Sequence, residues 1–191
     1  MNRKMYLVQQ NIANWRDNNG REKAWLANSG EILKWDIEKK YYTTDQREND
    51  KSEWYDSEHP KLNIILDILE QLLKQIDCTK NIAFIGDSTI DNHFIQEKET
   101  YSLSRRETSS LINSILSKRL NYTNLNVIYE CVCGSGLNGE NSIIDQFNRI
   151  KMYEYAYNIK FDIIICFAGW NSEKLTEDDV NKYTKQLFNL L

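Results

Sequence analysis

Residues 82–88 read IAFIGDS and contain the two features on which the fold prediction depends. The four apolar residues at 82–85 have the length and composition of a buried strand, and the Gly-Asp-Ser that follows is typical of a turn that opens a helix. Residues 131–139 (CVCGSGLNG) and 163–171 (IIICFAGWN) repeat this arrangement. The three segments hold five of the seven glycines of the chain. A chain so poor in glycine retains it where the backbone needs a positive φ or a close approach.

Helical patterns separate these apolar runs, so the chain is predicted to alternate strand and helix from residue 81 onwards. The predicted elements are a helix over 62–76, a strand over 81–85, a helical stretch near Ser88, a helix over 107–120, a strand over 126–132, a helix over 141–157, a strand over 161–167 and a helix from Thr176, where Thr-Glu-Asp-Asp resembles a capping box. Continuous apolar strands separated by helices indicate a parallel sheet covered on both faces. We therefore predict an α/β domain over residues 61–191 with strand order 2-1-3.

Residues 1–60 are predicted to form a separate helical and loop extension. Apolar residues at helical spacing run to about residue 38, and a polar, charged stretch follows as far as Pro60, the only proline. The order 2-1-3 leaves the apolar strand 161–167 at an open edge, which proteins usually cover. The sheet is thus predicted to be incomplete at its C-terminal side. We expect the N-terminal segment, through Trp15, Trp25 and Trp35, or a second copy of the chain to occupy that edge.

Each of the three turns carries a group that can assist acyl transfer. Ser88 follows a strand directly, so its hydroxyl and its N–H would both lie at a helix start, where backbone N–H donors are free. Asp and Ser are also the commonest residues at helix starts, and on its own the tripeptide favours a cap. The loop 134–139 offers N–H groups to an anion, and Asn171 has a side-chain amide that donates either to an oxyanion or to turn backbone. Asp87 and Asp91 are interpreted as cap and turn residues.

Together the three segments resemble the SGNH/GDSL hydrolase family over about residues 80–175. Ser88 in Gly-Asp-Ser matches the family's nucleophile, and Asn171 in Gly-Trp-Asn matches its asparagine. Gly136 matches the oxyanion glycine, with Gly134 as the alternative register. The resemblance implies a flavodoxin-like three-layer α/β/α sandwich and hydrolysis of a small ester, thioester or acetyl substrate. It also implies an oxyanion hole formed by Ser88, Gly136 and Asn171.

The sequence departs from the family at two points. Ser172 replaces the family's Asp after the Asn, and the C-terminal Asp-x-x-His block is absent from these residues. The two histidines are His59, in the polar stretch, and His93, which would lie about 140° away from Ser88 on a shared helix. A serine nucleophile is weak without an adjacent base. Two hypotheses follow: a hydrolase whose base comes from outside residues 1–191, and a non-catalytic SGNH-like domain that binds a partner or ligand.

Composition narrows the remaining function classes. The net charge is −4, with acidic and basic residues interspersed, which argues against nucleic-acid binding. No apolar run reaches transmembrane length. The four cysteines lack the spacing of a zinc or redox site and are expected to be reduced, which favours the cytoplasm. No motif indicates a cofactor or a metal. Tyrosines alternate over 153–157 in a predicted helix, and we assign them to packing.

Overall fold

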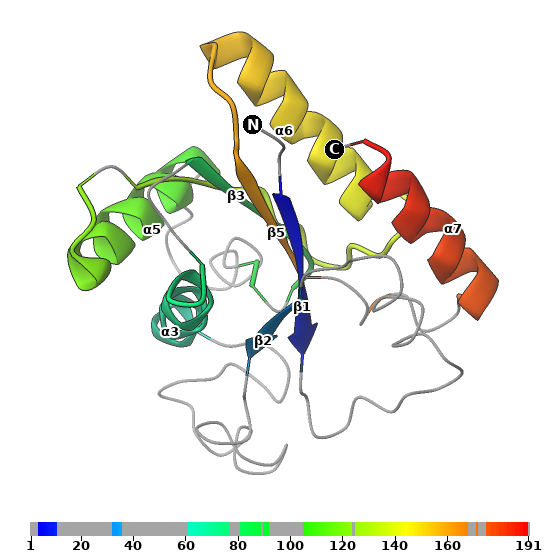
Figure 1. The fold of residues 1–191 in the computed structure, drawn as a ribbon, viewed down its shortest axis with the longest axis horizontal. Coiled ribbons are helices and arrows are strands. Elements are labelled where there is room, and N and C mark those ends of the chain that lie inside the picture. Colours follow the sequence, from blue (N-terminus) through cyan, green and yellow to red (C-terminus); the bar gives the residue numbers. More distant parts are fainter. Residues whose placement is uncertain are drawn as a thin grey trace, which may run out of the picture.

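The structure is a computed structural model that describes residues 4–10, 32–35, 61–76, 81–88, 90–91, 105–123, 125–167, 171 and 175–190. Strands and helices alternate over most of these ranges (Figure 1). In chain order the elements are β1 (Lys4–Gln10), β2 (Ile32–Trp35), α3 (Leu62–Leu73), β3 (Asn81–Ile85), α5 (Arg105–Leu120), β4 (Asn126–Tyr129), α6 (Ile143–Tyr157), β5 (Ile163–Cys166) and α7 (Glu177–Phe188).

The strands form one parallel sheet in the order β2-β1-β5-β3-β4. The three strands expected from the apolar runs are β3, β4 and β5, and β3 lies between the other two. The predicted α/β class with a parallel sheet is confirmed. The order of the whole sheet differs from the predicted 2-1-3, because β1 and β2 extend it beyond β5.

The described N-terminal residues are strands, so the predicted helix is wrong there. β1 pairs with β5 from Lys4↔Ile163 to Leu7↔Cys166, and β2 pairs with the other side of β1. The prediction that the β5 edge is covered is confirmed, and the N-terminal segment is the cover. That edge is therefore closed to pairing with a second copy, and the sheet is not left incomplete beside β5. Trp35 ends β2, whereas Trp15 and Trp25 lie outside the described residues.

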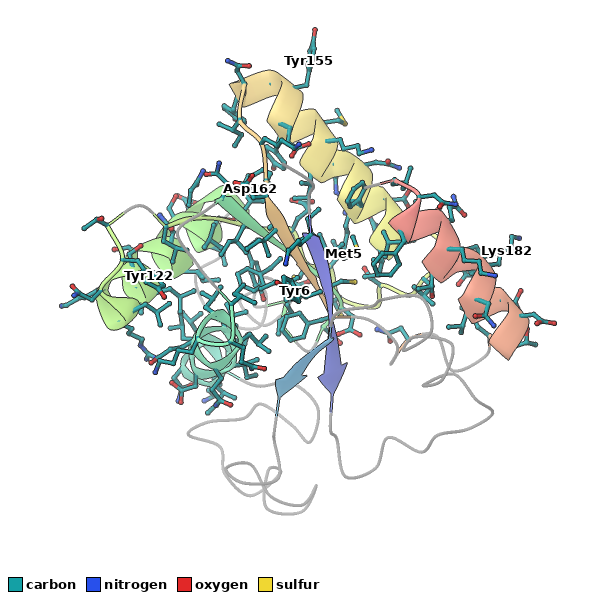
Figure 2. The ribbon with its side chains drawn as sticks, viewed as in Figure 1. Met5, Tyr6, Tyr122, Tyr155, Asp162 and Lys182 are labelled. Atoms are coloured by element: carbon teal, nitrogen blue, oxygen red, sulfur yellow. The ribbon has the colours of Figure 1, made fainter. Side chains whose placement is uncertain are left out.

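Side chains of the central strands alternate between two buried clusters, one on each face of the sheet. Ile82 and Phe84 of β3 belong to a cluster with α3 and α5, whereas Ala83 and Ile85 belong to a cluster with α6 and α7. β1 follows the same rule, because Met5 packs in the α6 and α7 cluster and its neighbour Tyr6 packs against the other (Figure 2). Burial on both faces explains why β3 and β5 are apolar throughout.

Two capping boxes fix the starts of the C-terminal helices. Ser142 and Asp145 form one at α6. Thr176 and Asp179 form the other at α7, and this box is the one that the sequence predicted. α6 ends at Asn158, which adopts a left-handed conformation with φ of 51°. None of the helices that the structure describes combines the length and the apolar character needed to cross a membrane.

Candidate functional site

The turn after β3 lies against the residue that follows β5, and this contact requires glycine. A Cβ atom at Gly86 would stand 2.7 Å from the Cβ and 2.8 Å from the carbonyl oxygen of Phe167. Real Cβ atoms do not approach backbone so closely, so even alanine would force the two segments apart. Close approach, one of the two reasons expected for retaining glycine, therefore applies at Gly86. The other reason applies at Gly134 and Gly139, which have φ of 75° and 89°.

A buried glutamine of α6 joins the turn after β3 to the loop after β4. Gln146 accepts a hydrogen bond from the N–H of Gly86 at 2.7 Å and donates to the carbonyl of Gly86 at 2.9 Å. The same Nε2 donates to the hydroxyl of Ser135 at 2.8 Å. Gln146 is fully buried, and Gly86 and Ser135 are buried as well. One side chain thus holds both backbone groups of Gly86 and the Ser-Gly loop in a fixed relation.

The segment after β5 contacts the same loop. The side-chain amide of Asn171 donates to the carbonyl of Ser135 at 3.3 Å. Asn171 itself is exposed, and its Nδ2 carries two hydrogens, of which this bond uses one. The structure therefore connects all three sequence segments: Gly86 to Ser135 through Gln146, and Ser135 to Asn171 directly.

The two remaining predicted site residues lie on these turns. Ser88 is partly buried in the turn after Asp87, where the carbonyl of Asp87 accepts from the N–H groups of Ile90 at 3.3 Å and Asp91 at 3.1 Å. This is one helical turn, and residues 92–104 lie outside the described part of the chain. Gly136 is buried, and its carbonyl accepts from Ile143 at 3.0 Å, which anchors the start of α6.

The acidic residues and the cysteines near these turns have structural contacts. Asp91 is buried, and its carboxylate accepts from the N–H of Cys133 at 2.6 Å, which links the turn after β3 to the residues after β4. This agrees with the interpretation of Asp91 as a turn residue. Burial raises the pKa of the Cys131 thiol, and the nearby charges of Asp91 and Asp87 raise it further. Burial and Asp87 also raise the pKa of the Cys166 thiol. Both thiols stay protonated at neutral pH, so neither is a ready nucleophile.

Gln146 is the residue that sequence reasoning missed. Ile143, Phe147 and Ile150 form the buried stripe of α6, and position 146 lies within that stripe. A polar residue at a position that helical spacing buries needs a hydrogen-bond partner, and this was the available signal.

His59, His93 and Ser172 lie outside the described residues. Within the described ranges, no group of three or more His, Cys, Asp or Glu side chains is arranged to hold a metal ion. The chain has no significant match to any protein-family model, to any curated protein or to any solved structure.

Proposed function

We propose that the chain is an SGNH-type serine hydrolase that cleaves an ester or acyl bond of a small substrate at the carboxyl ends of β3, β4 and β5. The hydrogen bonds that join Gly86, Ser135 and Asn171 support this proposal most directly. Open α/β sheets bind ligands at this edge, and these three segments are the ones that resemble the family. The finer fold we propose is the family's three-layer α/β/α sandwich, to which the α3/α5 and α6/α7 clusters correspond.

Each residue has a distinct role in the proposed reaction. The hydroxyl oxygen of Ser88 attacks the acyl carbonyl, its proton passes to a base, and the leaving group departs protonated. Water then hydrolyses the acyl-serine and regenerates the hydroxyl. The N–H groups of Ser88 and Gly136 and the second amide hydrogen of Asn171 donate to the oxyanion. The bond from Asn171 to Ser135 leaves that second hydrogen for the substrate and orients the amide.

In this proposal, the general base that accepts the proton of Ser88 comes from a group outside residues 1–191. Neither of the two histidines of the chain matches the family's Asp-x-x-His block. Removing one member of a catalytic triad typically lowers the rate by several orders of magnitude, and the oxyanion hole sustains the remainder. We therefore expect residues 1–191 to have weak esterase activity that an added base increases.

Hydrolysis of an activated aryl acetate, measured with and without imidazole, tests this proposal. Imidazole cleaves such esters itself, so the informative quantity is the increment that depends on the protein. We expect this increment in the wild type, its loss in Ser88→Ala, and a loss of about a hundredfold in Asn171→Ala, as for the removal of one oxyanion donor. Asn138→Ala, at an exposed residue in the loop after β4, is the control and should keep the increment.

An increment that Ser88→Ala retains would overturn the hydrolase. A folded wild type with no increment would favour the second hypothesis, a non-catalytic domain of the same fold. The cytoplasmic location that we propose rests on the free thiols of Cys131, Cys133 and Cys166.

A further inference from the structure

Among the strands that the structure describes, β4 lies at the edge of the sheet, and its outer side carries backbone groups that β3 does not use. The N–H of Glu130 donates to the carbonyl of Phe84, and Val127 is the register partner of Ile82. Hydrogen bonds alternate along a parallel ladder, so the backbone groups of Ile128 and Glu130 face β3. The N–H and C=O groups of Val127 and Tyr129 therefore point outward, away from the sheet.

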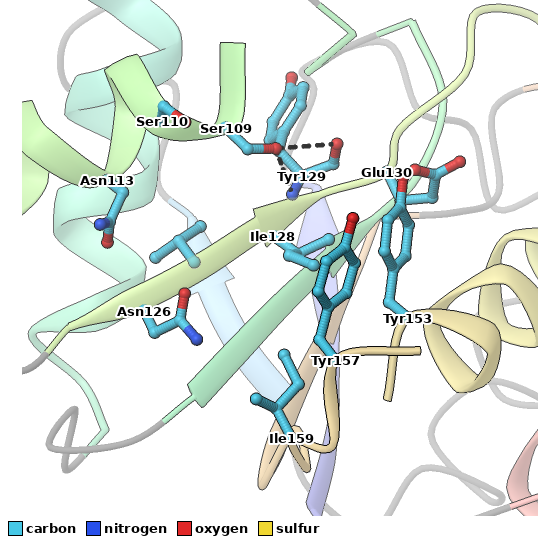
Figure 3. A pocket seen from close by; sticks show the side chains of 11 residues that line it. Ser109, Ser110, Asn113, Asn126, Ile128, Tyr129, Glu130, Tyr153, Tyr157 and Ile159 are labelled. Carbon is cyan, nitrogen blue, oxygen red and sulfur yellow. Dashed lines mark hydrogen bonds between the residues drawn. The ribbon is translucent and has the colours of Figure 1, made fainter. Parts of the chain in front are cut away.

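One of these two outward positions is already taken by a side chain of α5. The hydroxyl of Ser109 accepts from the N–H of Tyr129 at 3.0 Å and donates to its carbonyl at 3.5 Å (Figure 3). An added strand needs successive outward residues to build a ladder, and Ser109 removes one of them. Within β4, and among the described residues, the donor and acceptor pair of Val127 remains. This arrangement suits a small ligand better than an extended peptide.

A pocket of about 390 Å³ lies over this part of β4. α5 supplies Ser109, Ser110 and Asn113 to its lining, and the end of α6 supplies Tyr153 and Tyr157. Figure 3 shows the two tyrosines beside Ile128, on the opposite side of β4 from Asn113. The volume is at the lower end of the range for small-molecule sites, which indicates a compact ligand. We call it the β4 edge pocket.

Tyr153 and Tyr157 offer a flat aromatic surface on which a ligand can stack. The rings of Tyr153 and Tyr157 lie 6.1 Å apart between centroids and 15° from parallel. Tyr157 is 58% exposed, so its ring remains accessible to a ligand. At the far side, Asn113 Oδ1 is buried without a hydrogen-bond partner in the part of the chain that the structure describes. Rotating this amide toward a ligand breaks no bond of that oxygen.

Charge in the β4 edge pocket disfavours an anion. Its one acidic lining residue among those described is Glu130, and the lining includes no described Lys or Arg. Glu130 is 3% exposed and pairs with Arg149 through a 2.6 Å contact. The positive charge of Arg149 is thus already paired with Glu130, and the described lining supplies no cation to a phosphate. The ligand that fits is uncharged.

We propose that the β4 edge pocket binds a planar, uncharged heterocycle with a hydrogen-bond donor beside an acceptor, which is the chemistry of a nucleobase or nucleoside. The ring stacks on Tyr157, its donor and acceptor edge meets the C=O and N–H of Val127, and the amide of Asn113 adds a further polar contact. The site is separate from the turns that carry Ser88 and Asn171, so the proposal does not depend on hydrolase activity.

Titration of the ¹⁵N-labelled chain with adenosine, cytidine and AMP, followed by NMR, tests the proposal. We expect at least one nucleoside to shift the Val127 amide resonance, and AMP to bind more weakly than adenosine. Tyr157→Ala should weaken nucleoside binding about tenfold, as expected for the loss of one aromatic stacking partner. Tyr155→Ala is the matched control, since Tyr155 is on the same helix, is 93% exposed and projects away from the body (Figure 2).

The variants separate a built site from nonspecific stacking. Tyr155 and Tyr157 are largely exposed, so both alanine variants should fold. Amide spectra recorded without ligand verify this. Equal weakening by Tyr155→Ala and Tyr157→Ala would overturn the proposal. So would unchanged binding in Tyr157→Ala, AMP that binds as tightly as adenosine, or no Val127 shift at millimolar concentrations of both nucleosides.

Discussion

The carboxyl ends of the strands and the β4 edge pocket are built in opposite ways. At the carboxyl ends, the fully buried side chain of Gln146 holds the backbone of Gly86 and the hydroxyl of Ser135. At the β4 edge, the lining includes the ring of Tyr157, which is largely exposed. Substitution of Gln146 should thus alter folding, whereas substitution of Tyr157 should alter only ligand binding. The comparison can be tested by the stability of four sets of variants.

Gln146→Leu should have the largest effect. Leucine fills a similar volume but leaves the N–H of Gly86 without its buried partner. The carbonyl of Gly86 still accepts from the N–H of Val132, and the hydroxyl of Ser135 still donates to the carbonyl of Asn141. One unpaired buried donor costs about 1–3 kcal/mol and each of the two other lost hydrogen bonds about 1 kcal/mol, so we expect a loss of about 3 kcal/mol in the free energy of unfolding. Urea denaturation measures it. A loss below about 1 kcal/mol would show that the polar contacts do not hold the carboxyl ends together.

Gln146→Glu converts this contact into a test of pH dependence. A buried glutamate beside the Gly86 carbonyl has a pKa raised above its unfolded value of about 4.3, because burial disfavours the charge. Its protonated form can donate to that carbonyl, so the variant should be most stable, relative to the wild type, below about pH 4. Its stability relative to the wild type should then fall as the pH rises toward 7. A flat difference between the two proteins over this range would contradict the burial of position 146.

Gly86→Ala should cost about 2 kcal/mol, because its Cβ would collide with backbone and Cβ atoms of Phe167. Gly134→Ala is the matched control. A Cβ at Gly134 meets nothing within 4 Å, so only the positive φ opposes it, at about 1 kcal/mol. Denaturant unfolding of both variants distinguishes steric from conformational cost. Equal losses would mean that the contact between the β3 turn and Phe167 is not tight.

The two capping boxes allow a comparison of the same chemistry at different burial. Ser142→Ala and Thr176→Ala each remove a hydroxyl that accepts from the N3 backbone N–H, at about 1 kcal/mol. Ser142 is 5% exposed and opens α6 beside the Ser135 loop, whereas Thr176 is exposed, so the Ser142 variant should lose more. Thermal unfolding of both variants measures the difference. A larger loss for Thr176→Ala would reverse the ranking.

The Thr176 capping box also makes the stability of the protein depend on pH. Hydrogen bonds from Thr176 lower the pKa of Asp179. The stability that this contact contributes is therefore present above the unfolded pKa of Asp179 and is lost as the pH falls through the folded value. Thr176→Ala should flatten this part of the acid side of the stability profile.

Tyr157→Ala should have the smallest effect on folding, less than about 0.5 kcal/mol, because the side chain is mostly exposed. Thermal unfolding without ligand measures it. A loss near that of Gln146→Leu would mean that the β4 edge pocket is part of the core, and the contrast between the two regions would not hold.

The sequence predicted the elements whose pattern is local. Continuous apolar residues marked β3 and β5, and 3–4 spacing marked α3. The capping box at Thr176 was also readable, because its two partners are three residues apart. The order of the sheet was not readable in the same way, because β1 acquires its environment from β5, which is far from it along the chain. A short MYLV run followed by polar residues fits a helical window as well as a strand until that partner is known.

The candidate site likewise combines features that local sequence predicts with contacts that only the fold creates. Gly86 and the Ser-Gly loop followed from strand ends that carry glycine, and the structure joins them. Gln146, which makes the join, has no motif, and its role depends on two segments that are 60 and 11 residues away. Long-range polar contacts of this kind become visible only when the helix has been placed against the sheet.

The position of β1 in the sheet also affects how the chain is made. Lys4 of β1 is translated long before its partner Ile163 of β5, because the two residues are far apart in the chain. At synthesis rates of about 5–20 residues per second, β1 remains without its neighbour for roughly ten to thirty seconds. During that interval Met5 and Tyr6 have no β5 to pair with, and unpaired apolar segments are open to aggregation and to chaperones. A sheet in which β1 pairs with β5 can therefore be completed only after the helices and strands between them have been translated.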